Sequence, residues 1–372
     1  MSSRHEITNG KSASKPLRSF TKSKPQSHAA AGKAPFKLMR HYVKPGSEAE
    51  RIRHPRAGTH GPRREDIAGG LSPSPQHDLK YRGGRTIANL SYLNFFVGGS
   101  ASWNQSDVDS INGALAGAMS DPRLNNVIRQ YFSNQDISTT FVASHFVGTQ
   151  RPKRVTETSV KQLVSMLFTG GALSGLDFPN TVVNILLPSG TVLTDGTGPG
   201  REGKRDDDEP RAAGEPEKEE ASSLAGLGGY HGSVDVQNHR IYFAVGVYSQ
   251  ILPNGKENGI SVFDQPWKNV VATFYHELNE ARTDPDVDQA IATNVVDGVI
   301  GWNSDQGEEC GDFPVFEAGG LGNFGLVFQE VQLAASGSAP VQFQYSDAVH
   351  GPEGPIANPH PLLIAHEIED LA

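Results

Sequence analysis

The stretch Val270–Pro285, VVATFYHELNEARTDP, constrains this chain more than any other, because it has the pattern of a helix with two unlike faces. At about 100° per residue, apolar side chains gather in one stripe, which predicts packing against a core. One imidazole and three carboxylates gather on the opposite side, and such a face can hold a metal ion. The apolar positions are Trp267, Val270, Val271, Phe274, Leu278 and Ala281, and the polar ones are His276, Glu277, Glu280 and Asp284.

The spacing within this helix favours zinc. His276 and Glu280 stand four residues apart, so both side chains can reach one ion from adjacent turns. In the His-Glu-x-x-His motif the last residue is a second histidine and the intervening glutamate is a general base. Here Glu280 takes the place of that histidine, and a carboxylate is an acceptable zinc ligand. We therefore predict that His276 and Glu280 bind Zn²⁺ and that Glu277 activates a water whose pKa the ion lowers.

Two flanking motifs add candidate residues. A catalytic zinc needs a third protein ligand from a separate segment, and Glu309 or Asp312 of the downstream loop GWNSDQGEECGD can supply it. Asp284, at the end of the helix, is a further candidate ligand. Upstream, GYHGS places His231 between glycines, as a ligand, a substrate contact or a transition-state donor. The expectation is geometric: His276, Glu280 and Glu309 or Asp312 converge on one point, with His231 nearby.

Alternatives without a metal account for the same residues. The carboxylates of the helix can form a solvated acidic face that Asp284 ends before Pro285, and His231 can be a turn residue between glycines. The pair His-Glu is also common here, since it recurs at His5-Glu6 and His366-Glu367, which we interpret as chance. Cys310 is expected to be a small buried residue and not a nucleophile.

Charge is distributed unevenly along the chain. Residues 1–85 carry 18 of the 33 Lys and Arg residues but only 6 of the 42 Asp and Glu residues. The rest of the chain therefore carries 15 basic and 36 acidic residues. The arm is poor in apolar residues, so residues 1–85 are predicted to be disordered. A basic arm can bind nucleic acid through contacts that weaken with salt. That partner is not favoured, because no aromatic residues are interleaved with the basic ones and no nucleic-acid-binding motif is present.

The remaining chain predicts one α/β domain at residues 86–358 with a mixed central sheet and a zincin-like active-site helix. The nearly all-apolar Thr181–Pro188 is expected to be a central strand buried on both faces. An acidic stretch without periodicity at residues 195–228 is predicted to be a disordered insertion, and residues 359–372 a C-terminal tail.

Other sequence features limit the class of protein. The single cysteine excludes an internal disulfide. The sequence contains no run of 18 apolar residues, so no transmembrane helix is predicted. The N-terminus lacks the apolar segment of a secretory signal, so a cytoplasmic or unassigned location is expected.

Four segments in this order resemble one family. GYHG, HELNEARTDP, GWN followed by GEECGD, and QYSDAVHGPEGP are similar to segments of bacterial and fungal relatives of the plant phosphate-induced protein 1, or exordium, family. The resemblance covers about Ile87–Pro355 without the acidic insertion. It implies roles for His231, His276, Glu277, Glu280, Asp284, Glu309 and Asp312. The absence of a signal peptide and of paired cysteines departs from the plant members, so an apoplastic role and disulfides do not transfer.

Two hypotheses about function follow. The first is a metal-dependent hydrolase, most plausibly a zinc peptidase-like protein that acts on a peptide or protein. The second is a non-enzymatic exordium-like signalling or binding protein, in which the acidic cluster is structural or holds Ca²⁺.

Overall fold

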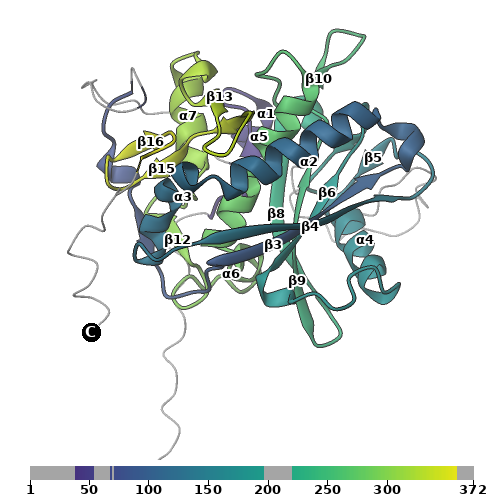
Figure 1. Ribbon diagram of the computed structural model, residues 1–372, viewed down its shortest axis with the longest axis horizontal. Coiled ribbons are helices and arrows are strands. Elements are labelled where there is room, and N and C mark those ends of the chain that lie inside the picture. The colour runs from purple at the N-terminus through teal and green to yellow at the C-terminus, as the bar shows by residue number, and fades with distance from the viewer. Residues whose placement is uncertain (1–37, 54–67, 69–70, 197–219, 358–372) are drawn as a thin grey trace, which may run out of the picture. The chain divides into compact units, whose positions relative to one another are not determined.

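A mixed six-stranded sheet organises the residues that the structure describes, which are 38–53, 68, 71–196 and 220–357 of a computed structural model (Figure 1). The strand order is β1-β8-β9-β6-β3-β4. The pairs β3–β4, β3–β6 and β6–β9 are parallel, and β8–β9 and β1–β8 are antiparallel. The strands are β1 (His41–Val43), β3 (Asn89–Val97), β4 (Ser138–Val147), β6 (Thr181–Leu186), β8 (Leu227–Val236) and β9 (His239–Gly246).

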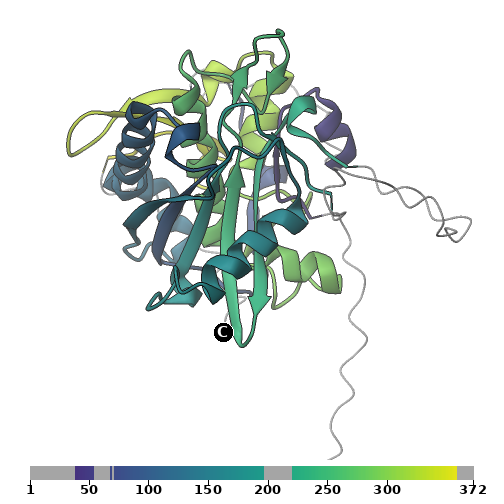
Figure 2. The same ribbon diagram turned by 90° about the vertical axis from the view of Figure 1, so that its right-hand side faces the viewer.

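Helices cover both faces of this sheet, as the side view in Figure 2 shows. Alternation along β3 explains why two cores form, because successive side chains of a strand point to opposite faces. Tyr92 and Phe96 pack with α2 (Gln105–Ser120) and α5 (Pro266–Thr283), whereas Leu93 and Phe95 pack with α4 (Glu157–Thr169). The expected α/β domain with a mixed central sheet is therefore confirmed.

The expected central strand is β6. All six of its residues are buried, and it lies between β9 and β3. Two covered faces explain why its sequence, TVVNIL, is mostly apolar and does not alternate between apolar and polar residues.

The strand β4 forms one edge of the sheet. Its ten residues, STTFVASHFV, include no Asp, Glu, Lys, Arg or Pro, and Val142 and Phe146 are exposed.

Of the helices in the described ranges, none is long and apolar enough to cross a membrane, which agrees with the sequence-based expectation.

Shorter elements complete the described part of the chain. The remaining helices are α1 (Glu48–Arg53), α3 (Pro122–Ile128), α6 (Val287–Thr293) and α7 (Asp312–Gly320). Two-stranded sheets are formed by β2 (Leu79–Tyr81) with β12 (Trp302–Ser304), β5 (Arg154–Val155) with β7 (Val192–Leu193), β10 (Gln250–Ile251) with β11 (Glu257–Asn258), β13 (Phe328–Gln332) with β14 (Ser338–Gln342), and β15 (Gln344–Ser346) with β16 (Gly351–Glu353).

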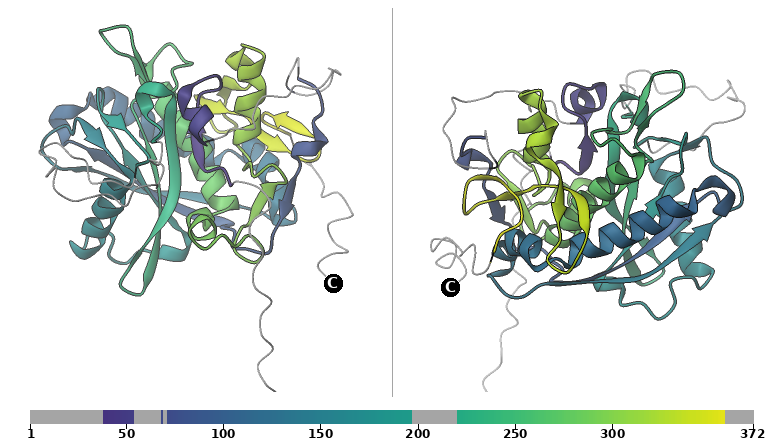
Figure 3. Two further views of the ribbon diagram at one scale, coloured as in Figure 1. Left: turned by 180° about the vertical axis from the view of Figure 1, so that it is seen from behind. Right: turned by 45° about the horizontal axis from the view of Figure 1, so that its top comes forward.

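The prediction of disorder over residues 1–85 is wrong for residues 38–53 and 71–85, which belong to the fold. The strand β1 pairs with β8, and β1 and α1 appear in purple beside it in Figure 3. Averaging composition over 85 residues concealed short segments whose apolar side chains are buried, such as Tyr42 and Leu79. Residues 1–37, 54–67 and 69–70 lie outside the described residues.

Basic residues of this arm pair with acidic residues of the body. Arg53 pairs with Asp195, Lys44 with Glu257, and Lys80 and Arg82 with Asp305; Arg40 has two partners, Glu157 and Asp288. Part of the positive charge of the N-terminal segment is thus neutralised by ion pairs within the fold.

The prediction of a disordered insertion over residues 195–228 is wrong for residues 195–196 and 220–228, which belong to the fold. Asp195 is buried and accepts from the backbone N–H of Ala221 at 2.8 Å, and β8 already begins at Leu227. Residues 197–219, which hold most of the acidic stretch, and the predicted tail 359–372 lie outside the described residues.

A largely buried group of four charges joins the residue before β1 to two helices. Arg40 is 6% exposed and lies 2.8 Å from Glu157 of α4 and 2.7 Å from Asp288 of α6. Lys161 contacts the same two carboxylates at 2.8 and 3.1 Å. Because a buried charge without its partner is costly, this group should fix β1 at the edge of the sheet.

We therefore expect Arg40→Ala to lower the free energy of unfolding by about 3 kcal/mol, since Lys161 alone then faces two buried carboxylates. Urea denaturation followed by circular dichroism measures this. Arg51→Ala is the matched control, because Arg51 pairs with Glu48 where both side chains are mostly exposed, and it should cost less than about 1 kcal/mol. Equal losses in the two variants would contradict the anchoring role.

Candidate metal centre

The polar face of α5 meets two other segments inside the protein. His231 comes from β8, Glu309 from the loop between β12 and α7, and Asp312 begins α7. All seven residues that the sequence singled out are at most 2% exposed: His231, His276, Glu277, Glu280, Asp284, Glu309 and Asp312.

Both faces of α5 are buried. Its apolar side, including Phe274 and Leu278, lies in the core with α2, as the stripe predicts. On the other side, Glu277, Glu280 and Asp284 are 0% exposed, so the alternative of a solvated acidic face is wrong. The polar face is covered because the helix packs against β8 and β14.

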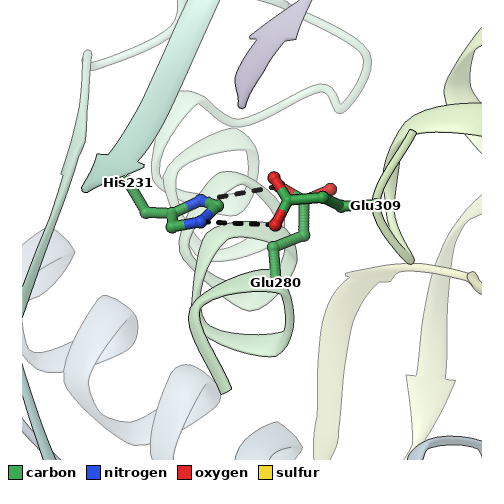
Figure 4. A group of neighbouring side chains, drawn as sticks. All are labelled: His231, Glu280 and Glu309. Carbon is green, nitrogen blue, oxygen red and sulfur yellow. Dashed lines mark ion pairs between the residues drawn. The ribbon is translucent and has the colours of Figure 1, made fainter. Parts of the chain in front are cut away.

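His231 links the helix to the downstream loop, as Figure 4 shows. One ring nitrogen, Nδ1, lies 3.3 Å from Glu277 Oε2 and 3.7 Å from Glu280 Oε2. The other, Nε2, lies 3.4 Å from Glu309 Oε1 and 3.3 Å from the carbonyl oxygen of Asp284. The imidazole therefore stands between carboxylates of two segments.

His276 is oriented by a residue of β14. Gln342 donates through Nε2 to the carbonyl oxygens of Gly311 and Phe343 at 2.8 and 2.9 Å, so its Oε1 is free to accept. That oxygen lies 2.5 Å from His276 Nδ1, which therefore carries the proton and donates. The lone pair of a neutral His276 is then on Nε2, which lies 3.1 Å from Glu280 Oε1.

Gly311 in the motif GEECGD allows this close packing. A Cβ atom at that position would lie 2.3 Å from His276 Nδ1 and 3.0 Å from Glu280 Oε1. The backbone N–H of Gly311 also donates to Glu280 Oε1 at 3.1 Å. A side chain there would displace both candidate ligands.

Within the described residues, two groups have ligand atoms that all lie within 4.8 Å of one another. One is His231, Glu280 and Glu309, and the other is His276, Glu277 and Glu280. Glu280 belongs to both, whereas the predicted combination of His276 with Glu309 or Asp312 forms neither. Asp284 Oδ1 accepts from the N–H of Gly301 at 3.1 Å, and Asp312 Oδ2 accepts from the N–H of Glu309 at 2.9 Å, so these two aspartates shape the loop.

Comparison with protein-family models, with curated proteins and with solved structures found no match.

Several buried atoms of the centre have no hydrogen-bond partner. They are Glu277 Oε1, Glu280 Oε2, Asp284 Oδ2, both carboxylate oxygens of Glu309, and His276 Nε2. Throughout the described ranges, the ion pairs of Glu277, Glu280 and Glu309 are with the two histidines, and none is with Lys or Arg. Buried polar atoms are normally paired, so this group of oxygens requires protons or a cation.

The electrostatics of the metal-free centre agree with that requirement. Burial raises the pKa of Glu309 well above its ordinary range. The nearby His231 lowers this pKa and the nearby Glu280 raises it, and the net shift is upward. Burial likewise raises the pKa of Asp284 to about 7. For His276, burial lowers the pKa, but Glu280 and Glu277 outweigh it and raise the pKa to about 9. Without a cation, protons compensate the carboxylates.

Sequence reasoning missed two residues of this centre. Gln342 orients His276 from 66 positions along the chain, and the ring centroid of Tyr42 lies 4.5 Å from that of His276. Gln342 ends an ordinary short strand and Tyr42 falls in the supposed arm, so neither carried a local signal. Cys310 is buried as expected, and burial raises the pKa of its thiol well above the ordinary value.

The metal-free protein should lose stability as pH rises. A group whose pKa is higher in the folded state stabilises the fold below its unfolded pKa, and this is lost as pH rises through the folded value. For Asp284 that window runs from 3.8 to about 7, and for His276 from 6.5 to about 9. At about 1.4 kcal/mol per pKa unit, we expect a loss of at least about 2 kcal/mol between pH 5 and 9, measured by urea denaturation in chelator.

Asp284→Asn provides the matched variant for that measurement, because it removes one titrating group and keeps the acceptor for Gly301. Its stability should fall less steeply between pH 5 and 7 than that of the parent. A parent protein that gains stability over this range would contradict the argument.

Proposed function

We propose that this protein binds a divalent metal ion at the centre formed by α5, β8 and the loop before α7. The observation that carries the proposal is the set of buried carboxylate oxygens without hydrogen-bond partners, of which Glu309 contributes both. Carboxylate and imidazole together suit Zn²⁺ and other first-row divalent ions. His231, Glu280 and Glu309 would hold the ion.

We further propose metal-dependent hydrolysis of a peptide or protein, with α5 in the role of a zincin-like active-site helix. A bound ion would lower the pKa of a water molecule at the centre. Glu277 would take a proton from that water, a role supported by its Oε1, which lacks a hydrogen-bond partner, and by its Oε2, which lies 3.3 Å from His231 Nδ1. Since every candidate ligand is buried, a substrate reaches the centre only if a covering segment moves.

That burial favours a second candidate function, in which the ion is structural. A closed site with all positions filled by protein is typical of structural metal ions. The protein would then be a non-enzymatic relative of the exordium family. The segments GYHG, HELNEARTDP and GEECGD, on which that resemblance rests, supply the side chains of the centre.

Metal analysis by mass spectrometry tests the shared part of both candidates. Protein purified without chelator should contain stoichiometric Zn²⁺ or another first-row ion, and Glu280→Ala should lose most of it, because Glu280 belongs to both ligand groups. His350→Ala is the matched control, since His350 pairs with Asp78 outside the centre. A wild-type protein without any transition metal would refute the proposal.

Hydrolysis of casein or a peptide library separates the two candidates. If the protein is a hydrolase, Glu277→Gln should lower kcat by at least about 100-fold, because the base is lost, while the ion held by His231, Glu280 and Glu309 is retained. If the ion is structural, wild-type protein shows no hydrolysis above the Glu280→Ala background, and chelation lowers Tm.

Gln342→Leu tests the orientation of His276. We expect metal affinity to fall about 10- to 100-fold, because an imidazole without its hydrogen-bond acceptor loses its preferred tautomer and orientation. Competition with a chromophoric chelator measures this affinity. Gln329→Leu, on the exposed side of the neighbouring strand, is the control and should bind as wild type. Unchanged affinity in Gln342→Leu would remove Gln342 from the centre.

A further inference from the structure

The two oxygens of Glu280 face different histidines. Oε1 lies 3.1 Å from His276 Nε2, and Oε2 lies 3.7 Å from His231 Nδ1. Both oxygens are buried, and Oε2 has no hydrogen-bond partner. A carboxylate in this position can bind one cation through each oxygen.

Each side of Glu280 has its own further ligands. On the Oε1 side, His276 and Glu277 complete a group of three, and Glu277 Oε1 and His276 Nε2 lack hydrogen-bond partners. On the Oε2 side, His231 and Glu309 complete the other group, and both oxygens of Glu309 lack partners. Neither group contains both histidines, so the atoms divide between two positions.

We propose that the centre binds two divalent metal ions bridged by the carboxylate of Glu280. One ion is held by His276 and Glu277, and the other by His231 and Glu309. This inference rests on the proposed function, because it presupposes that the centre binds metal. It adds the number of ions, their separate ligands and the bridging role.

Charge supports two ions over one. When Glu277, Glu280, Asp284, Glu309 and Asp312 are all ionised and the histidines are neutral, the centre carries five negative charges. One divalent ion leaves a charge of −3 and two leave −1, which is far less costly among buried side chains. Carboxylate-bridged pairs about 3.5–4 Å apart are a known arrangement for divalent ions in hydrolytic sites.

The ligand types define the class of ion. Two imidazoles with carboxylates and no thiolate suit Mn²⁺, Fe²⁺ or Zn²⁺. Cys310 does not compete, because its thiol donates to Gln344 at 3.3 Å. With two ions Glu277 is a ligand of the ion beside His276, in place of the base role that it has with a single ion, so Glu277→Gln is expected to lose that ion and keep the other. Retention of both ions in that variant would overturn this assignment.

Metal stoichiometry tests the inference. Metal-free protein dialysed against excess Zn²⁺ and then freed of unbound metal should hold two ions per chain by mass spectrometry, after subtraction of the content of Glu280→Ala. One ion would overturn the second position and leave the proposed function intact. Zero ions would overturn both.

Single variants assign the two positions. His276→Ala and His231→Ala should each retain one ion, Glu280→Ala should lose both, and the control His350→Ala should retain two. Loss of both ions in a histidine variant that keeps the wild-type circular dichroism spectrum would overturn the separation into two positions.

Electron paramagnetic resonance with Mn²⁺ as the probe tests their proximity. Two Mn²⁺ ions bridged by one carboxylate are exchange-coupled, so the six-line spectrum of isolated Mn²⁺ should be replaced at two equivalents. His276→Ala loaded with Mn²⁺ should show the isolated six-line spectrum. An isolated spectrum in the fully loaded wild type would overturn the bridge.

Discussion

Uncompensated negative charge in the interior is the constraint on which the rest of this structure depends. Five carboxylates lie within the protein, three from α5 and its C-terminal end and two from the loop before α7 and the first residue of α7. Among the described residues, the ion pairs of this group are with two histidines. Such a group destabilises a fold unless protons or a cation neutralise it. The surrounding elements nevertheless hold these oxygens close together, which lowers the stability of the metal-free fold.

The α5 helix and the central strand β6 were predicted well from the sequence, because the pattern that indicates each of them is local. The 3.6-residue period fixed which side of Val270–Pro285 is apolar, and the apolar run Thr181–Pro188 marked the central strand. Placing GYHG and GEECGD near His276 depended on their order along the chain and on the family resemblance. The structure brings these segments together, with His231 within 3.4 Å of Glu309.

Other features could not be predicted because they arise from tertiary contacts. Glu280 faces His276 with one carboxylate oxygen and His231 with the other. This arrangement depends on the direction of the side chains, which the spacing of residues along the chain does not give. Gln342 and Tyr42 reach the centre from distant segments that look ordinary in isolation. The average composition of residues 1–85 also concealed β1, because the whole segment is basic. Arg40, directly before β1, pairs with the carboxylates of Glu157 and Asp288.

The pairing of β1 with β8 has a consequence for the order of folding during synthesis. Arg40 and the carbonyl oxygen of His231 that it approaches are 191 residues apart. The first strand of the sheet to leave the ribosome must therefore wait, unpaired, until most of the domain has been made. Closing so long a loop costs conformational entropy, so β1 should dock late onto a nearly finished sheet. The segment that later covers His276 is thus unpaired during most of the synthesis of the domain.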